Sequence, residues 1–416
     1  MHQEIKLPNG ARLLTEEVPG ARSAALGFFV GVGSRHETAG ENGAAHFIEH
    51  MLFKGTHRRS AAQLARDMDA IGGQVNAYTT KENTCFYART LDKHLDRSLD
   101  ILSDMIFHSR FDQGDVDTER GVILEEIGMY EDTPEDLAAE RLSAAVYKGT
   151  PLARPILGTQ NTLSNMSGEW LAQWQRDHYR PGNLVVALAG SFTQNQVDGL
   201  KACLADLEPG PALTQAPAAY RPAVTARKKA IEQNHLILAF PAITYLDERR
   251  PQMLLLNSLL GGGCSSRLFQ EVREKRGLCY TVYSYVSDHE DTGLLGIYTA
   301  VNKEQEGQAL ETVRRIVSDL ADHGPTQEEL DRVREQTKAN LLMGSESIQA
   351  RMSQLGSSAL LYGRVRELDE ILARYDAVTR EQLRDLAGEI FQMDRASLSA
   401  VGRVGSAQSY SQWLGR

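Results

Sequence analysis

The chain has few cysteines and no long apolar run. Its four cysteines among 416 residues form no Cys-x-x-Cys pair and no disulfide-framework spacing, which favours free thiols in a reducing compartment. No stretch approaches the roughly 20 apolar residues of a membrane span. The first residues resemble neither a signal peptide nor an arginine-rich transit sequence. We therefore expect a cytoplasmic protein without a membrane span, most simply a bacterial one, although a mature organellar form would start in the same way.

Basic residues are outnumbered by acidic ones. With 45 Lys and Arg against 55 Asp and Glu, the formal net charge is -10. A negative balance argues against nonspecific nucleic-acid binding, because the phosphate backbone attracts cationic surfaces. It is compatible with basic or amphipathic peptides as partners.

The length exceeds what one hydrophobic core usually serves, so we expect two domains. A break lies near the middle, where residues 207–222 hold four of the 13 prolines and little periodic apolar pattern. The predicted organisation is a first domain over residues 1–208, a linker over 209–226 and a second domain over 227–416.

Histidine is also scarce, with 11 in the chain, yet two lie four residues apart with a glutamate between them. His46, Glu49 and His50 would occupy little more than one helical turn. Residues four apart share a helix face, so the two imidazoles can bind one metal ion while Glu49 stands beside them as a base. The alternative is that both histidines are ordinary packed or solvent-tipped residues.

A catalytic zinc site normally takes a third protein ligand and leaves one position for water. The segment from Glu119 to Tyr130 has apolar residues at helical intervals and acidic residues at 119 and 126, two turns apart on one face. Glu126 is the candidate ligand, and Glu119 could orient a ligating histidine. The alternative is a solvated charged helix face.

These motifs resemble the inverted-motif zinc peptidases, the family of pitrilysin, insulin-degrading enzyme and the mitochondrial processing peptidase β subunit. The likeness also covers four further blocks: residues 31–37, 43–56, 72–79 and 178–183. It implies one Zn²⁺ per chain bound by His46, His50 and Glu126, with Glu119 as an outer carboxylate. It implies peptide hydrolysis in which Glu49 takes a proton from the zinc-bound water and returns it to the leaving amine.

The two halves resemble each other, which indicates a duplicated domain. The stretch from Asp115 to Gly149 matches the stretch from Glu329 to Gly363, and each is followed by helical pattern and a final apolar strand. Predicted strands (24–32, 75–88 and 236–240) alternate with helices (91–107 and 305–320), so we expect an α+β fold with antiparallel sheets and helices on one side. At the positions of His46, Glu49, His50 and Glu126 the second copy has Leu254, Asn257, Ser258 and Asn340.

The resemblance also implies a role for the second domain. In the block from Phe269 to Tyr280, Arg273 would anchor substrate carbonyl groups and Tyr280 would donate a hydrogen bond to the oxyanion. The alternatives are a surface ion pair for Arg273 and a core position for Tyr280. Chains of this size in the family pair into a four-domain, clam-like chamber, so we expect a dimer, a homodimer before a heterodimer, with Arg273 and Tyr280 reaching the partner's zinc.

Substrate peptides would bind beside the metal. Gly72 and Gly73 before the strand leave room for another backbone, and an extended peptide could add to it as a further strand. By the resemblance, Asn76 and Ala77 would contact that peptide; the alternative is an ordinary central strand. The rival function is a non-catalytic structural or partner subunit, which typically lacks ligands or base, whereas this chain has all of them.

Overall fold

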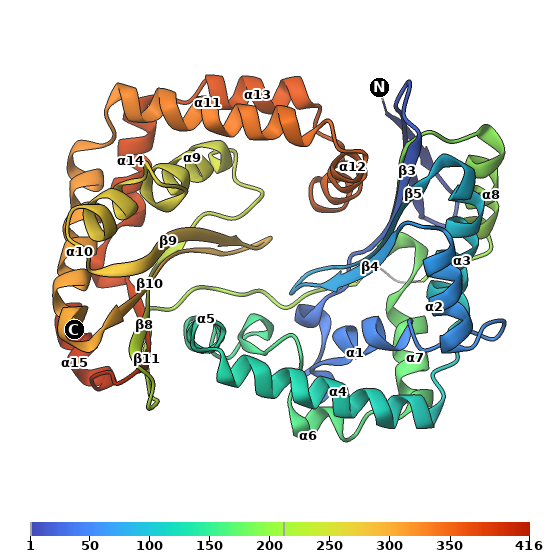
Figure 1. Ribbon diagram of the computed structural model, residues 1–416, viewed down its shortest axis with the longest axis horizontal. Helices are drawn as coiled ribbons and strands as arrows, with labels where there is room; N and C mark the ends of the chain where they lie inside the picture. The colour runs from blue at the N-terminus through green and yellow to red at the C-terminus, as the bar shows by residue number, and fades with distance from the viewer. Residues whose placement is uncertain (1, 211–212) are drawn as a thin grey trace. The chain divides into compact units, whose positions relative to one another are not determined.

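The computed structural model describes residues 2–210 and 213–416 and divides into two compact units (Figure 1). The first unit contains Met1–Ile127, Arg154–Ala216 and Leu342–Arg366, and the second contains Gly128–Ala153, Pro217–Leu341 and Glu367–Arg416. Each unit thus includes a segment from the opposite half of the chain. The predicted domain boundaries, with a linker over residues 209–226 between the two copies, remain a prediction. Residues 211 and 212 of that linker lie outside the described residues.

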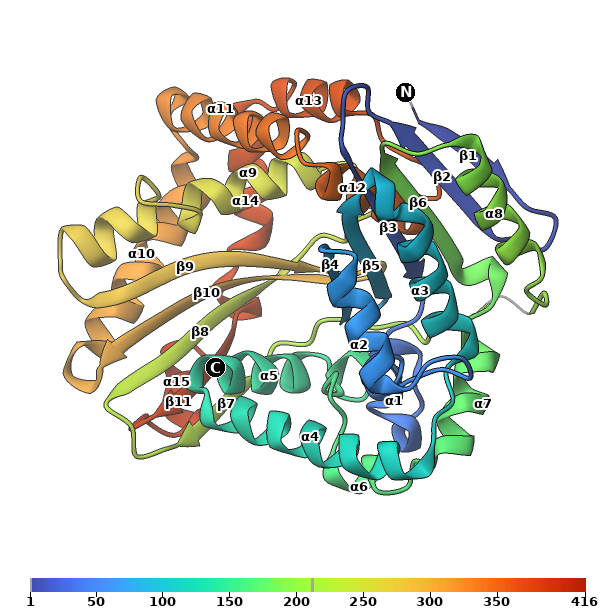
Figure 2. The same cartoon turned by 45° about the vertical axis from the view of Figure 1, so that its right-hand side comes forward.

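The first unit is built on a six-stranded sheet in the order β1-β2-β6-β3-β5-β4 (Figure 2). Its strands are β1 (Gln3–Lys6), β2 (Arg12–Glu17), β3 (Ser23–Val30), β4 (Gln74–Thr79), β5 (Thr84–Leu91) and β6 (Leu184–Gly190). Only β2 and β6 pair in parallel; the other neighbours are antiparallel. The strand β4 ends the sheet, so one of its edges has no partner strand among the described residues.

Helices cover both faces of this first sheet. They are α1 (Ala44–Met51), α2 (Ala61–Ala70), α3 (Leu95–His108), α4 (Gln113–Asp132), α6 (Gln160–Leu163), α7 (Gly168–His178), α8 (Gln194–Ala205) and α12 (Ile348–Tyr362). Alternate residues of a strand point to opposite faces. Leu26 and Phe28 accordingly belong to the large core beneath α1 and α3, whereas Ala25 and Phe29 pack with Met352 and Leu355 of α12.

The helix α12 comes from the second half of the sequence and lies directly against β3 of the first unit. A Cβ atom added at Gly356 would come within 2.0 Å of the Phe29 ring, and one added at Gly27 within 2.4 Å of the Met352 sulfur. Glycine at these two positions therefore permits a close approach of helix and sheet that any side chain would prevent.

The second unit has a five-stranded sheet in the order β7-β11-β8-β10-β9. Its strands are β7 (Val224–Lys228), β8 (Gln233–Ala242), β9 (Cys279–Asp288), β10 (Gly293–Asn302) and β11 (Ser397–Gly402). The parallel pair is β7 with β11, and the other neighbours are antiparallel. This order repeats the β2-β6-β3-β5-β4 order of the first sheet, as expected for a duplicated domain.

Both faces of the second sheet are also covered. The helices of this unit are α5 (Pro134–Val146), α9 (Arg250–Gly261), α10 (Glu306–His323), α11 (Gln327–Gly344), α13 (Leu368–Asp376), α14 (Arg380–Ile390) and α15 (Ala407–Trp413), and η6 (Phe269–Glu274) is a π-helix. Leu236 and Leu238 of β8 belong to the core with α9, α10 and α14, whereas Ile237 and Ala239 pack with α5. The helix α5 comes from the first half of the sequence.

The predicted α+β class, with two antiparallel-rich sheets covered by helices, is confirmed. Two details were wrong. Helices cover both faces of each sheet, since α12 and α5 take the second face. Residues 75–88 form two strands, β4 and β5, joined by a turn in which Thr80 N donates to Asn83 O at 2.8 Å. None of the helices in the described part of the chain has both the length and the apolar character needed to cross a bilayer.

Candidate metal centre

The helix α1 carries the two histidines and is held firmly at its start. Gly43 precedes it with φ +100°, a left-handed conformation that favours glycine. The buried carboxylate of Glu37 accepts hydrogen bonds from Gly43 N (2.8 Å) and Ala45 N (2.9 Å), which have no partner within the helix, and from the Asn42 amide (2.9 Å). Burial raises the pKa of Glu37 to about 7, against the effect of these donors. His46, the third residue of α1, therefore lies in a first turn that is held in place.

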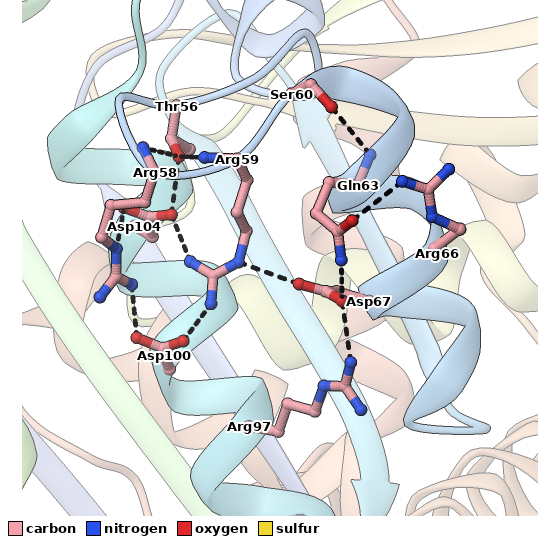
Figure 3. A network of polar contacts seen from close by, with 10 residues as sticks. All are labelled: Thr56, Arg58, Arg59, Ser60, Gln63, Arg66, Asp67, Arg97, Asp100 and Asp104. Carbon is pink, nitrogen blue, oxygen red and sulfur yellow. Dashed lines mark hydrogen bonds and ion pairs between the residues drawn. The ribbon is translucent and has the colours of Figure 1, made fainter.

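The loop after α1 is held by a network of ion pairs with α2 and α3 (Figure 3). Asp104 of α3 is 1% exposed and accepts from the Thr56 hydroxyl at 2.7 Å and from Arg58 Nε at 3.1 Å. The Arg59 guanidinium contacts Asp104, Asp100 and, at 3.1 Å, Asp67. The network fixes the chain after the carboxyl-terminal end of α1, whereas Glu37 holds its amino-terminal end.

His46, His50 and Glu126 lie close enough to share one ion. The Glu126 Oε2 atom is 3.7 Å from His46 Nε2 and 3.6 Å from His50 Nε2, and the ligand atoms of all three residues lie within 4.8 Å of one another. The helix α4 brings Glu126 to α1 across the unit, with Val116, Glu119 and Ile123 as its buried positions. No other such group of three occurs within residues 2–210 and 213–416.

This donor set fits zinc. Bonds of about 2.0–2.1 Å in tetrahedral geometry place two ligand atoms about 3.4 Å apart, close to the separations from Glu126. Two imidazoles and one carboxylate are also the protein ligands of catalytic zinc sites that keep a fourth position open. Burial, and next the neighbouring His50, lowers the pKa of His46 to about 3, so its imidazole is neutral and able to bind a cation.

Glu49 stands beside the two histidines on α1 and contacts the sheet. The Thr79 hydroxyl, on β4, donates to Glu49 Oε2 at 2.5 Å. Burial raises the pKa of Glu49, whereas this hydroxyl and His50 lower it and Glu126 raises it. A raised pKa suits a carboxylate that must take and return a proton near neutral pH.

Glu119 connects the site to a cation. It is 4% exposed, and its Oε1 atom lies 2.8 Å from His50 Nδ1. Its Oε2 atom lies 2.5 Å from the Lys54 ammonium. The corresponding nitrogen of His46, Nδ1, is buried without a hydrogen-bond partner in the structure. Only one of the two imidazoles is therefore oriented by a carboxylate.

Asn76 and Ala77 lie on β4, the edge strand next to α1. Asn76 is exposed, Ala77 is half-buried towards the core, and Thr79 points to the same side as Ala77. The strand is therefore not an ordinary central one. Its unpaired edge has the main-chain groups that an added peptide strand needs.

Arg273 and Tyr280 lie in the second unit, on the π-helix η6 and at the start of β9. The Arg273 guanidinium lies 4.7 Å from the ring centroids of both Tyr280 and Phe269, and its contact with Glu274 is a long 3.9 Å. Tyr280 is 76% exposed, so it is not a core aromatic. The two residues form one stacked pair, in which Tyr280 is exposed and the Arg273 side chain is half-buried at 34% exposure.

Sequence reasoning missed Lys54, Thr79 and Glu37 as neighbours of the site. Their contacts join residues that lie far apart in the chain, such as Lys54 with Glu119 and Thr79 with Glu49. Lys54 follows His50 by four residues, and this helical spacing was the one signal that could have placed its side chain near that of His50.

Comparison with known proteins gives the family. The model for insulinase (peptidase family M16) matches residues 12–160, and the model for the peptidase M16 inactive domain matches residues 165–337. The chain is 42% identical over 402 residues to an uncharacterized zinc protease of Bacillus subtilis, covering 96% of this chain and 98% of that one. It is 41% identical to an uncharacterized zinc protease of Streptomyces coelicolor, covering 97% and 90%. The chain belongs to the insulinase family, peptidase family M16.

Two solved structures share the whole fold. A peptidase M16 inactive domain from Pseudomonas fluorescens superposes with a TM-score of 0.90 at 23% identity, covering 98% of both chains. A protease from Helicobacter pylori gives a TM-score of 0.90 at 21% identity, covering 97% and 99%. The predicted resemblance to inverted-motif metallopeptidases, and the predicted class of enzyme, are confirmed at the level of the family.

Proposed function

We propose that this protein is a zinc-dependent endopeptidase that cleaves extended peptides. The observation that carries the proposal is the grouping of His46, His50 and Glu126 with Glu49 beside them. Membership of peptidase family M16 supports it, as do the relatives whose names describe zinc proteases. One Zn²⁺ per chain would be bound by the two imidazoles and the Glu126 carboxylate.

The residues of the chain have separate tasks in this proposal. A zinc ion supplies Lewis acidity, which acidifies water and polarises the scissile carbonyl. Glu49 accepts the proton of the attacking water and returns it to the leaving amine, while the Thr79 hydroxyl holds its carboxylate. Glu119 keeps the His50 imidazole with Nε2 facing Glu126, where the ion would bind.

The substrate would be an unstructured segment that adds to the free edge of β4, where Asn76 and Ala77 contact its backbone. Main-chain hydrogen bonds depend little on sequence, so several peptides could bind. The net charge of -10 favours basic or targeting-type peptides. Arg273 would hold substrate carbonyls and Tyr280 the oxyanion, from the second chain of a homodimer. A cytoplasmic location, inferred from the sequence, completes the proposal.

The test is proteolysis with metal control. The purified protein is incubated with internally quenched peptides of about 10 to 30 residues, long enough to add a strand, with and without phenanthroline. Cleavage should stop with the chelator and return on adding zinc.

Glu49→Gln should lose turnover and keep its zinc, whereas His46→Ala should lose both. The peptide assay measures turnover, and metal analysis measures the zinc content. Chelator-insensitive cleavage would contradict the zinc-dependent mechanism. No cleavage by a zinc-loaded protein would contradict the proposal and favour a non-catalytic partner subunit.

A further inference from the structure

Lys54, Glu119 and His50 form a short chain of contacts on the side of His50 that faces away from Glu126. His50 directs Nδ1 to Glu119 Oε1 at 2.8 Å and Nε2 towards Glu126 Oε2 at 3.6 Å. The Lys54 ammonium lies 2.5 Å from Glu119 Oε2 as an ion pair, and this oxygen has no hydrogen-bond partner in the structure. The two oxygens of one carboxylate are thus divided between the imidazole and the cation.

Burial makes the cation important to this carboxylate. The Glu119 side chain is only 5% exposed, while that of Lys54 is 34% exposed and reaches the carboxylate from the surface. A buried carboxylate is costly unless it is paired and hydrogen-bonded. In the part of the chain that the structure describes, Lys54 is the cationic side chain recorded within ion-pair distance of Oε2. Without it, Glu119 would be drawn towards water.

The position of Glu119 matters because a ligating imidazole must offer its unprotonated nitrogen to the ion. When Nδ1–H donates to a fixed acceptor, Nε2 keeps its lone pair and the ring keeps its orientation. His50 has such an acceptor in Glu119, whereas His46 Nδ1 has no hydrogen-bond partner in the structure. Of the two histidines, only His50 is therefore oriented by a hydrogen bond to its Nδ1 atom in the described structure.

We propose that Lys54 is a positioning residue of the metal centre, which holds Glu119 against His50 and thereby strengthens zinc binding. The inference rests on the proposed metal site but concerns how tightly the ion is bound. A purely Coulombic role would have the opposite sign, because a lysine near the site repels a cation and its removal would tighten binding. The two accounts are separated by the direction of one measurement.

The experiment is a zinc-affinity measurement on metal-free protein by competition with a chromophoric chelator. Lys54→Met keeps the length of the side chain and removes its charge, and we expect zinc affinity to fall about tenfold, the lower end for partners that orient a ligand. Lys54→Arg should recover most of the affinity because it keeps the ion pair. Lys93→Met, at an exposed lysine of the same unit, is the matched control and should bind zinc like the wild type. Unchanged or tighter binding by Lys54→Met would overturn the proposal.

A double-mutant cycle tests the route through Glu119. If Lys54 acts by placing that carboxylate, Lys54→Met should have no further effect in a Glu119→Gln background. An equal loss in both backgrounds would overturn the proposal. Thermal unfolding of the metal-free variants checks folding, and Lys54→Gln replaces Lys54→Met if the latter does not fold. A wild type that binds no zinc would instead contradict the proposed function, so the two failures are distinguishable.

Discussion

Glu49 is oriented by a hydroxyl group from another element. Thr79 Oγ1 donates to its Oε2 atom at 2.5 Å and lies 3.4 Å from Thr84 Oγ1, which itself donates to Val32 O at 2.9 Å. The anchoring atoms belong to β4, to β5 and to the segment that follows β3, so the sheet limits the freedom of the carboxylate. A base that must reach a water and then a leaving amine gains from such restriction.

Replacing this hydroxyl should impair turnover more than binding. We expect Thr79→Val, which keeps the branched shape, to lower kcat about tenfold or more, because a hydrogen bond to a charged group contributes about 1.5–3 kcal/mol. KM and zinc content should change little. Thr79→Ser keeps the hydroxyl and should retain most of kcat. Steady-state kinetics on a quenched peptide measure both parameters, and wild-type kcat for Thr79→Val would contradict the assignment.

Residues of the centre differ in how far the sequence reveals them. His46, Glu49 and His50 are readable because helical spacing alone places them together, and Glu119 and Glu126 because two turns separate them on one helix. Lys54 offers only its four-residue spacing from His50, beyond the end of α1 at Met51, and Thr79 carries no such signal. Their partners, Glu119 and Glu49, lie on other elements, and single lysines and threonines are common on any surface.

At the scale of elements, the loop after α1 depends on paired charges between α2 and α3. Burial alone would raise the pKa of Asp67, but hydrogen bonds from Arg97, Arg59 and Gln63 lower it. The pKa of Asp100 is lowered in the same way, by Arg58 and Arg59 against burial. Both carboxylates thus bind protons less readily in the folded chain than in the unfolded one.

This difference predicts a loss of stability in acid. A carboxyl group whose pKa is lower in the folded state contributes stability above its unfolded value, about 3.9, and loses it as the pH falls through the folded value. We expect the free energy of unfolding of the wild type to fall below about pH 4. Asp67→Asn should be less stable than the wild type at pH 6 but should lose less on acidification to pH 3. Urea denaturation at both pH values measures this, and parallel losses would contradict it.

The β4–β5 hairpin illustrates why an element can be misjudged. Its turn, Thr80 to Asn83, contains neither glycine nor proline, so the strand-like pattern of residues 75–88 continues through it. The turn is closed instead by side-chain contacts, in which Thr80 Oγ1 donates to Asn83 O and accepts from Asn83 N. The position of α12 is harder to predict from the sequence than this turn. An amphipathic pattern predicts that α12 has an apolar face but not which sheet that face packs against.

At the scale of the whole molecule, the candidate metal ligands and the stacked Arg273–Tyr280 pair belong to different units. The first unit holds His46, His50 and Glu126, and the second holds Arg273 and Tyr280. The matching strand order of the two sheets supports the duplication that was predicted from sequence. The open question is whether Arg273 and Tyr280 complete the site of their own chain or that of a second chain in a dimer.

Mixed dimers answer that question. Glu49→Gln and Tyr280→Phe proteins, each impaired alone, are mixed and allowed to exchange subunits. If the site is shared between chains, half of the sites in each mixed dimer combine an intact Glu49 with an intact Tyr280, so random exchange should restore about a quarter of wild-type activity. Exchange is verified with two affinity tags. Activity no higher than the mean of the two parents, despite verified exchange, would contradict a shared site.

The reciprocal placement of α5 and α12 has a consequence for biosynthesis. The second face of the first sheet is covered by residues 348–362, so this unit cannot complete its core until most of the chain has left the ribosome. The second sheet needs α5, which is made long before its strands. A gene fragment that encodes either half alone would therefore yield a sheet with one bare apolar face, a product prone to aggregation.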